Sequence, residues 1–220
     1  MENELSNSER YRRERAHQVE ERRNAIIAAA TEVFLEKGLG QTSMLDIANH
    51  AHISKVTLYR YFPNRDPIAF EVAAQMLNTI MTTATQSVSE GATAMEGIRG
   101  LCLGMIDEFP ALCGAYRYVG MFDHLYGDRY PSEELASWYK QHIFSLTIDG
   151  VSPMFAEDFD EQKRTKIVTT FNMIMSFLQK MAARGELIAE EQEIPLQAQL
   201  EAFKEIVLIY LDSLQGAQNE

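Results

Sequence analysis

The chain of 220 residues contains two cysteines and one tryptophan. Two cysteines cannot form a disulfide framework, so we expect Cys102 and Cys113 to be free thiols in a reducing cytoplasm. Long apolar runs are also scarce. The longest near the C-terminus, residues 206–211, is far shorter than the roughly 18 residues that a membrane-spanning helix needs. No apolar stretch precedes Ala25, which argues against a signal peptide. A cytoplasmic protein without a membrane segment is therefore expected.

Excess positive charge is missing overall but not locally. The net charge is −12, from 20 basic and 32 acidic residues. Residues 1–70 hold 10 of each sign, so residues 71–220 hold 10 basic and 22 acidic residues and carry the whole acidic excess. Residues 10–65 alone carry 10 basic and 6 acidic residues, a net charge of +4. Salt screens charges beyond about 10 Å, so the acidic remainder of the chain does not prevent residues 10–65 from attracting DNA phosphates. The asymmetry therefore indicates a DNA-binding N-terminal region followed by an acidic C-terminal region.

No alternation of apolar and polar residues typical of a strand persists over five residues, and no repeat or glycine-rich phosphate loop is present. Apolar residues instead recur at helical spacing, and Gly or Pro separates the longer segments. The pattern predicts an all-α fold of about nine helices, at residues 22–37, 45–51, 55–61, 65–88, 93–108, 111–127, 132–149, 160–184 and 195–215. Three regions follow: a polar, Arg-rich N-terminal arm at 1–20, a DNA-binding domain at 21–66 and a helical body at 67–220.

Two short helices joined by a tight turn follow the first long helix, which is the pattern of a helix-turn-helix. Ser43 and Asp46 have the spacing of a capping box, and Ser54 is placed to cap the second short helix. That second helix must fit a major groove about 12 Å wide. The side chains predicted to point outward from this helix are those of Lys55, Val56, Thr57 and Tyr59. Val56 and Thr57 suit thymine methyl groups, Lys55 a guanine edge or a phosphate, and Tyr59 and Arg65 the flanking phosphates.

This stretch is similar to the DNA-binding region of the tetracycline-repressor (TetR) family over about residues 22–72. The matching positions are Ile27, Ala30, Phe34, Gly38, Thr42, Ile47, Ala48, Ala51, Ser54, Tyr59, Tyr61, Phe62 and Arg65. The resemblance implies an N-terminal three-helix helix-turn-helix domain and a C-terminal helical domain for ligand binding and dimerisation. The DNA-contacting residues expected from the pattern and the resemblance are Thr42, Ser43, Ser54, Lys55, Val56, Thr57, Tyr59, Arg60, Tyr61 and Arg65.

Three positions depart from the family pattern. His52 replaces the usual glycine of the turn, so it must tolerate a positive φ unless the turn shifts. Val56 replaces a common glycine of the recognition helix, and Arg65 replaces the usual lysine. The four arginines of the arm (Arg10, Arg12, Arg13 and Arg15) resemble minor-groove arms of other DNA-binding proteins. A solvated tail without DNA contacts is the alternative.

The last two predicted helices are the most apolar. The final one is apolar nearly all round, so it needs partners on both sides. We expect an intersubunit four-helix bundle in a two-fold dimer, as the family resemblance also implies; a fully internal helix is the alternative. The expected interface residues are Ile167, Ile174, Phe177, Leu178, Phe203, Val207, Tyr210 and Leu214.

Residues 76–144 are rich in methionine and aromatic residues, which suit an adaptable apolar pocket or ordinary core packing. The expected ligand-binding residues are Met76, Met105, Phe109, Tyr116, Phe122, Trp138, Phe171 and Met175. No acid–base pair, nucleophile triad or metal-ligand spacing is present, so we expect neither an enzyme, nor a cofactor, nor a metal site.

The leading hypothesis is a homodimeric transcriptional regulator that binds double-stranded DNA. It is most simply a repressor released from a pseudo-palindromic operator by a small apolar or aromatic effector. The alternative is a non-sensing DNA-binding adaptor that recruits a protein partner through its acidic body.

Overall fold

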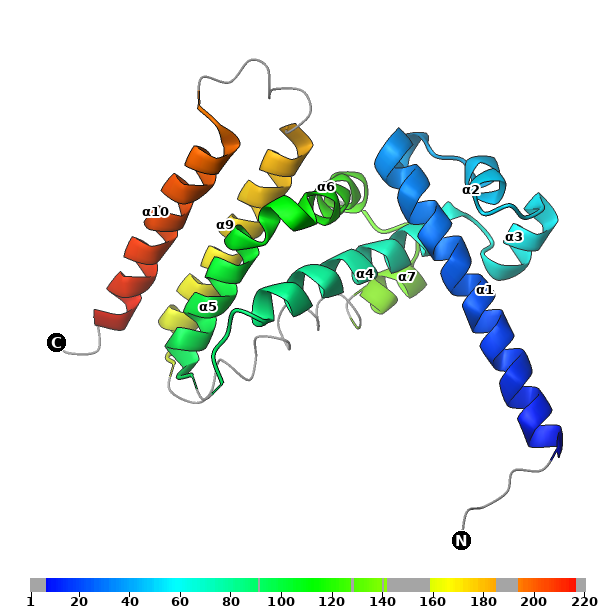
Figure 1. Cartoon of the computed structure of the whole chain (residues 1–220), viewed down its shortest axis with the longest axis horizontal. Coiled ribbons are helices and arrows are strands. Elements are labelled where there is room, and N and C mark those ends of the chain that lie inside the picture. Colours follow the sequence, from blue (N-terminus) through cyan, green and yellow to red (C-terminus); the bar gives the residue numbers. More distant parts are fainter. Residues whose placement is uncertain are drawn as a thin grey trace, which may run out of the picture. The chain divides into compact units, whose positions relative to one another are not determined.

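The computed structural model describes residues 7–90, 92–127, 129–139, 141, 159–184 and 194–216. These residues form nine α-helices and one short 3-10 helix, without a strand, which confirms the expected all-α fold (Figure 1). The chain divides into two compact units, residues 1–72 and 73–220, and the division falls inside helix α4 (Arg65–Thr85). No helix of the described part is long and apolar enough to cross a bilayer.

The first unit contains α1 (Asn7–Lys37), the 3-10 helix η1 (Leu39–Gln41), α2 (Met44–His50), α3 (Lys55–Tyr61) and the first turns of α4. Its core is built on one apolar face of α1, at the positions that the helical spacing predicted. The fully buried side chains of this core include Ile26, Ile27, Phe34, Ile47, Leu58, Phe62 and Ile68. Gly38 ends α1 with a φ of 86°, a conformation that glycine adopts without strain.

Helix α1 begins at Asn7, well before the expected start at residue 22. The described part of the predicted N-terminal arm, residues 7–20, is therefore helical. The stretch lacks an apolar stripe, and for that reason the periodicity missed it. It also lacks Gly and Pro and is rich in Glu and Arg, which have high helix propensity. Extending an existing helix requires no new nucleation, so this composition is sufficient.

The second unit contains the rest of α4, α5 (Ala94–Asp107), α6 (Phe109–Tyr126), α7 (Glu133–Tyr139), α9 (Glu161–Arg184) and α10 (Leu196–Gly216). Helix α6 packs along α9, while α5 contacts α6, α9 and α10. The buried side chains at these contacts include Ile98, Leu101, Met105, Tyr116, Val119, Ile167, Ile174 and Leu178. Of the helix expected at 132–149, residues 140 and 142–149 lie outside the described residues.

Candidate DNA-binding surface

A capping box fixes the start of α2. The Ser43 side chain accepts a hydrogen bond from the Asp46 N–H, and the Asp46 carboxylate accepts one from the Ser43 N–H at 2.9 Å. Lys37, the last residue of α1, donates to the same carboxylate at 2.5 Å. The hydrogen bonds from Lys37 and then from Ser43 hold the pKa of Asp46 well below its usual range. The end of α1 is thereby tied to the beginning of α2.

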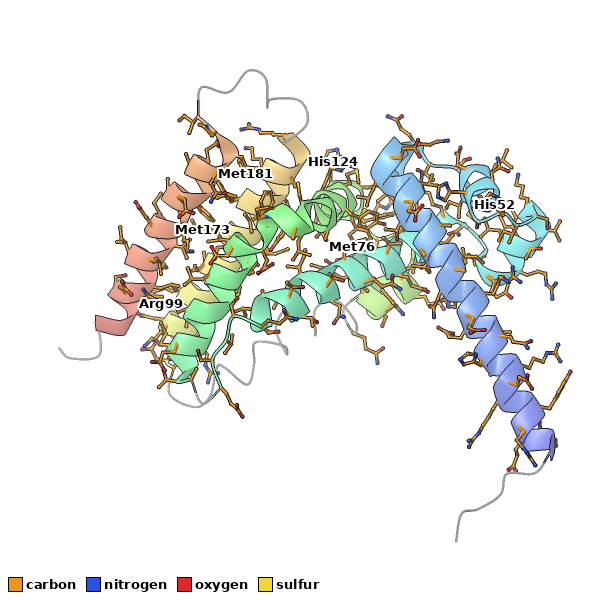
Figure 2. All side chains as sticks on the ribbon, viewed as in Figure 1. His52, Met76, Arg99, His124, Met173 and Met181 are labelled. Carbon is orange, nitrogen blue, oxygen red and sulfur yellow. The ribbon has the colours of Figure 1, made fainter. Side chains whose placement is uncertain are left out.

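The turn between α2 and α3 has the geometry that the sequence predicted. His52 has a φ of 53°, in the left-handed region where glycine is the usual residue. The Ile53 N–H donates to the Ala48 carbonyl at 3.0 Å and closes the turn. Figure 2 labels His52, whose side chain is exposed. His52 therefore adopts a backbone conformation that has a higher free energy for histidine than for glycine.

Helix α3 presents its side chains outward around one buried anchor. The Ser54 side chain accepts a hydrogen bond from the Thr57 N–H at 3.0 Å, which caps the helix as expected. Leu58 is fully buried, whereas Val56 is 74% exposed and Tyr59 is 45% exposed. The Lys55 ammonium lies 5.8 Å from the Tyr59 ring centroid. Arg60 is also exposed, and Tyr61 and Thr57 are half-buried. A slim helix with one apolar anchor and outward polar and β-branched side chains can enter a major groove.

Two residues of the expected DNA-contacting set point inward instead. Thr42 is 2% exposed, and its hydroxyl donates to the Gly38 carbonyl at 2.9 Å. The Arg65 Nη1 donates to the carbonyls of Leu39, Gly40 and Thr42 at 2.9, 3.2 and 3.0 Å. Both side chains hold η1 in place. For Thr42 this differs from the DNA contact that we expected, because a buried hydroxyl cannot reach a phosphate.

Arg23 is a structural residue that the sequence pattern did not single out. Its guanidinium lies 4.4 Å above the centroid of the Phe62 ring and pairs with the Glu71 carboxylate of α4. Burial raises the pKa of Glu71, and the nearby Arg23 charge opposes that rise. These contacts join α1 to the end of α3 and the start of α4. A charged residue at the edge of an apolar run gives no signal in the sequence that it makes such contacts.

In the second unit, two aromatic groups contain part of the expected ligand-binding set. The Phe109 and Tyr116 rings are 5.4 Å apart, and the buried Tyr116 hydroxyl donates to the Met105 carbonyl at 3.2 Å. Phe122 stacks on Tyr139 with ring centroids 5.9 Å apart. The remaining members of the set, on α4, α7 and α9, are half-buried: Met76 (labelled in Figure 2), Trp138, Phe171 and Met175.

The expected dimer residues divide into buried and exposed ones. Five of them are buried within this chain, with exposures of 6% or less: Ile167, Ile174, Leu178, Val207 and Leu214. Phe177 and Phe203 are half-buried and stack on each other at 3.9 Å, between α9 and α10. Only Tyr210 is exposed, at 40%. The five buried residues are core residues, because the neighbouring helices of the same chain already cover them.

Other apolar residues of α9 and α10 face outward and were absent from the expected set. Met173 is 62% exposed on α9 (labelled in Figure 2), and Ile206 and Ile209 are 63% and 71% exposed on α10. Val168 adds a smaller exposed side chain at 36%. We call Met173, Ile206, Ile209 and Tyr210 the α9–α10 apolar face; Val168 lies about half a turn from Phe177, the α9 side chain that contacts α10, and is not part of it. Helical periodicity shows that two stripes exist, but it does not say which of them faces the core.

Residues 26–72 match the family model of the bacterial regulatory proteins of the TetR family. The match includes most of the first unit's core together with α2, the turn and α3. The N-terminal segment of this chain is therefore similar to the DNA-binding region of the TetR family. The matching residues coincide with the helix-turn-helix whose geometry is described above.

Curated relatives are similar to this chain over limited segments. The transcriptional regulator HbdR of Aromatoleum sp. is 44% identical over 61 residues, which are 28% of this chain and 27% of HbdR. The fatty acid metabolism regulator protein of Bacillus subtilis is 32% identical over 89 residues, 40% of this chain and 44% of that protein. The chain thus matches less than half the length of these relatives.

Solved TetR structures match nearly the whole chain in fold. A TetR family transcription regulator from Marinobacter aquaeolei VT8 has a TM-score of 0.58 at 18% identity, covering 90% of this chain and 97% of the other. The ketosteroid transcriptional regulator KstR2 of Mycobacterium tuberculosis has a TM-score of 0.51 at 17% identity, covering 87% and 94%. The expected fold, an N-terminal helix-turn-helix domain followed by a helical C-terminal domain, is confirmed.

Proposed function

We propose that this chain is a homodimeric transcriptional regulator that binds a pseudo-palindromic operator in the cytoplasm. In the simplest scheme it is a repressor, released when a small apolar or aromatic effector binds the second unit. The observation that carries the proposal is α3: a capped, seven-residue helix with Leu58 buried and Lys55, Val56 and Tyr59 exposed. The family match supports the DNA-binding part, since the matched segment contains this helix.

The DNA contacts follow from exposure and chemistry. A helix of seven residues is about 10 Å long and reads about three base pairs. Val56 supplies an apolar contact for a thymine methyl, and Lys55 supplies a donor for a guanine edge or a phosphate. Tyr59, Arg60 and Tyr61 contact the flanking phosphates. Ser54 remains in the proposed set, because its exposed hydroxyl can donate to a phosphate while accepting the capping bond. Ser43 also remains in the set as an exposed residue, and its hydroxyl must release the Asp46 carboxylate before it can donate to a phosphate. Arg65 stabilises this surface indirectly, through its hydrogen bonds to the carbonyls of η1 and Thr42.

The α9–α10 apolar face supports a dimer. Met173, Ile206 and Ile209 are each more than 60% exposed, and such large apolar side chains rarely cluster on a monomer without a partner. A second copy is the occupant that we propose, because a two-fold axis makes one patch complementary to itself. Dimerisation also supplies the second recognition helix that a two-fold operator requires. Stable interfaces of this kind bury about 1,200–2,000 Å² in total.

The effector class follows from what the second unit offers a ligand. Its candidate lining is aromatic and methionine side chains with few polar groups, which suits an apolar molecule. The names of two similar proteins refer to fatty acid metabolism and to ketosteroids, and both names concern largely apolar compounds. Apolar ring or chain compounds are therefore the first effectors to screen.

The decisive experiment is selection of duplexes from a random DNA pool by the full chain, followed by gel shifts at fixed salt with excess unrelated DNA. We expect a two-fold symmetric sequence, and loss of specific binding in the double variant Lys55→Ala/Tyr59→Ala. Glu36→Ala, at an exposed position of α1, is the control and should bind normally. Failure to enrich any sequence would contradict the proposal, and normal specific binding by the double variant would refute the assignment of α3.

The effector part is tested separately. Once an operator is selected, apolar and aromatic compounds are added to the complex and release is followed by fluorescence anisotropy. We expect at least one class to release the DNA, because a differential affinity of a few kcal/mol between two states is sufficient. Unchanged operator affinity across broad compound libraries would contradict sensing and favour a DNA-binding adaptor.

A further inference from the structure

The first turns of α1 stand apart from the rest of the first unit. Residues 7–22 continue the docked part of the helix, and Figure 1 shows this blue segment running past α2 and α3. Every side chain from residue 8 to residue 22 is exposed. At 1.5 Å per residue the segment is about 24 Å long. Because the segment has no apolar face, its composition and its continuity with the docked part of α1 stabilise the helix, rather than packing.

Charge on this segment is sorted by helix face. At about 100° per residue, Tyr11, Arg12, Arg15, Val19 and Arg22 fall within an arc of about 100°. We call these five residues the basic stripe. All four acidic residues of the segment lie on the opposite side, within an arc of about 140°. They are Glu9, Glu14, Glu20 and Glu21. The net charge of the segment hides this separation.

The basic stripe leads into the DNA-binding surface. The next residues on the same face of α1 are Arg23 and the buried Ile26. Arg23 lies over the ring of Phe62, which directly follows the last residue of α3, Tyr61. The stripe therefore leaves the domain beside the C-terminal end of the recognition helix. Because a recognition helix lies in the major groove between two phosphate backbones, DNA bound by α3 extends beyond the helix.

We propose that the basic stripe binds the phosphate backbone of the operator DNA outside the half-site read by α3. The proposal rests on the proposed function and extends its footprint. From Tyr11 to Arg22 the stripe spans about 16 Å, which corresponds to about five phosphates along one strand. Arg12, Arg15 and Arg22 supply the cations, and the Tyr11 hydroxyl supplies a further donor.

Geometry favours the backbone over the minor groove, where the arginines of an extended arm would bind. An α-helix with its side chains is about 10–12 Å wide, whereas the minor groove is about 6 Å wide. Because residues 7–22 are helical, the segment cannot enter that groove. A second copy of the chain is a poorer occupant, since three arginines on each stripe repel and only Tyr11 and Val19 offer apolar contact.

The segment contains its own matched control. Arg12→Gln/Arg15→Gln removes two charges from the basic stripe, whereas Arg10→Gln/Arg13→Gln removes two from the opposite face. Both variants lose the same charge within one turn, and Gln keeps the helix propensity of Arg. Circular dichroism checks that the helix is retained, and sedimentation checks the oligomeric state. The probes are the selected operator duplex with about ten flanking base pairs on each side and the same duplex trimmed at the half-sites.

The parent chain should bind the flanked duplex more tightly than the trimmed one. We expect Arg12→Gln/Arg15→Gln to lose that preference and to lower the slope of log K against log salt by about 2 per subunit, with affinity falling about tenfold or more at 0.1 M salt. Arg10→Gln/Arg13→Gln should keep the flank preference and most of the slope. Equal losses in both variants would show a diffuse charge effect and overturn the proposal.

Four other results are also decisive. No loss in either variant overturns the proposal, and so does a change of oligomeric state confined to the stripe variant, which would show contact between copies. If the parent chain selects no DNA at all, the proposed function fails and this proposal with it. If it selects an operator but shows no preference for flanks, only the present proposal fails.

Discussion

The Nη1 of Arg65 donates to the carbonyl oxygen of Thr42 at 3.0 Å, so the first residue of α4 is bonded to the residue that precedes the capping box of α2. The same nitrogen reaches the Leu39 carbonyl at 2.9 Å, and Thr42 in turn donates to Gly38. One guanidinium thus binds both ends of the segment between α1 and α2 and holds that segment against the start of α4. The position that the family pattern associates with a phosphate contact also fixes the geometry of the turn.

Replacing Arg65 should therefore affect folding as well as DNA binding. We expect Arg65→Ala to lower the free energy of unfolding by about 1–3 kcal/mol, because the carbonyls of η1 lose a charged donor. Arg65→Lys should retain part of that stability, since an ammonium also donates but lacks the planar fork. Urea denaturation measures both. Arg60→Ala, at an exposed position of α3, should change stability by less than about 0.5 kcal/mol. Equal stability of Arg65→Ala and the parent would show that these bonds contribute nothing.

The positive φ of His52 gives a second prediction. In the left-handed region a β-branched side chain clashes with the backbone, so His52→Val should destabilise the domain by about 1–2 kcal/mol. His52→Gly should lie within about 1 kcal/mol of the parent, because relief of strain is offset by the larger entropy of the unfolded chain. The two variants are compared by chemical denaturation. A Val variant as stable as the Gly variant would mean that the turn rearranges.

Asp46 makes the first unit sensitive to acid. Its pKa is lowered in the folded state by the hydrogen bonds from Lys37 and Ser43, so the folded chain favours the carboxylate. This contribution to stability is present above the unfolded pKa of about 3.9 and is lost as the pH falls through the folded value. Asp46→Asn should therefore be less stable near neutral pH, and should lose less stability than the parent below about pH 4. Thermal melts from pH 7 to pH 3 measure the difference. Glu36→Gln is the matched control, and a parallel pH profile for Asp46→Asn and the parent would count against the role of the pair.

The cases of Ser43, His52 and Thr42 show how far the sequence reaches. Capping residues act on backbone groups two or three positions away, so Ser43 and Ser54 could be predicted from spacing alone, and the φ of His52 followed from its place in the turn. Arg65 could not be interpreted fully, because the carbonyls that its side chain binds lie more than 20 positions away. The Thr42 hydroxyl has a local partner, Gly38, but the spacing of residues does not show that Thr42 is buried. The same limit applies to α9 and α10. Ile174 and Met173 are neighbours in sequence, yet one is buried and the other is 62% exposed.

Close contact between α4 and α5 depends on Gly104. A Cβ added there would lie 2.5 Å from the Ala84 carbonyl oxygen and 3.0 Å from its Cα, which are backbone atoms that cannot rotate away. We expect Gly104→Ala to destabilise the second unit by about 1–3 kcal/mol, although alanine favours a helix by about 1 kcal/mol. In Gly120→Ala the new Cβ lies 3.3 Å from the Gln179 Cβ, and a shift of a few tenths of an ångström relieves that contact, so this control should cost less than Gly104→Ala. Thermal denaturation ranks them, and the opposite order would contradict the packing.

The α9–α10 apolar face gives the last prediction, which concerns assembly. Ile209 is 71% exposed, so Ile209→Lys removes no core contact within the chain and should leave its thermal stability as a monomer nearly unchanged. If a second copy covers this face, two lysines brought together near a two-fold axis repel each other and lose their hydration. We therefore expect the dissociation constant of the dimer to rise at least tenfold. Analytical ultracentrifugation across a concentration series measures this shift. Leu125→Lys places the same charge on an exposed apolar position of α6 and should remain dimeric. Dissociation by the Leu125 variant instead would place the interface on α6, and a monomeric parent chain would remove the dimer from the proposed function altogether.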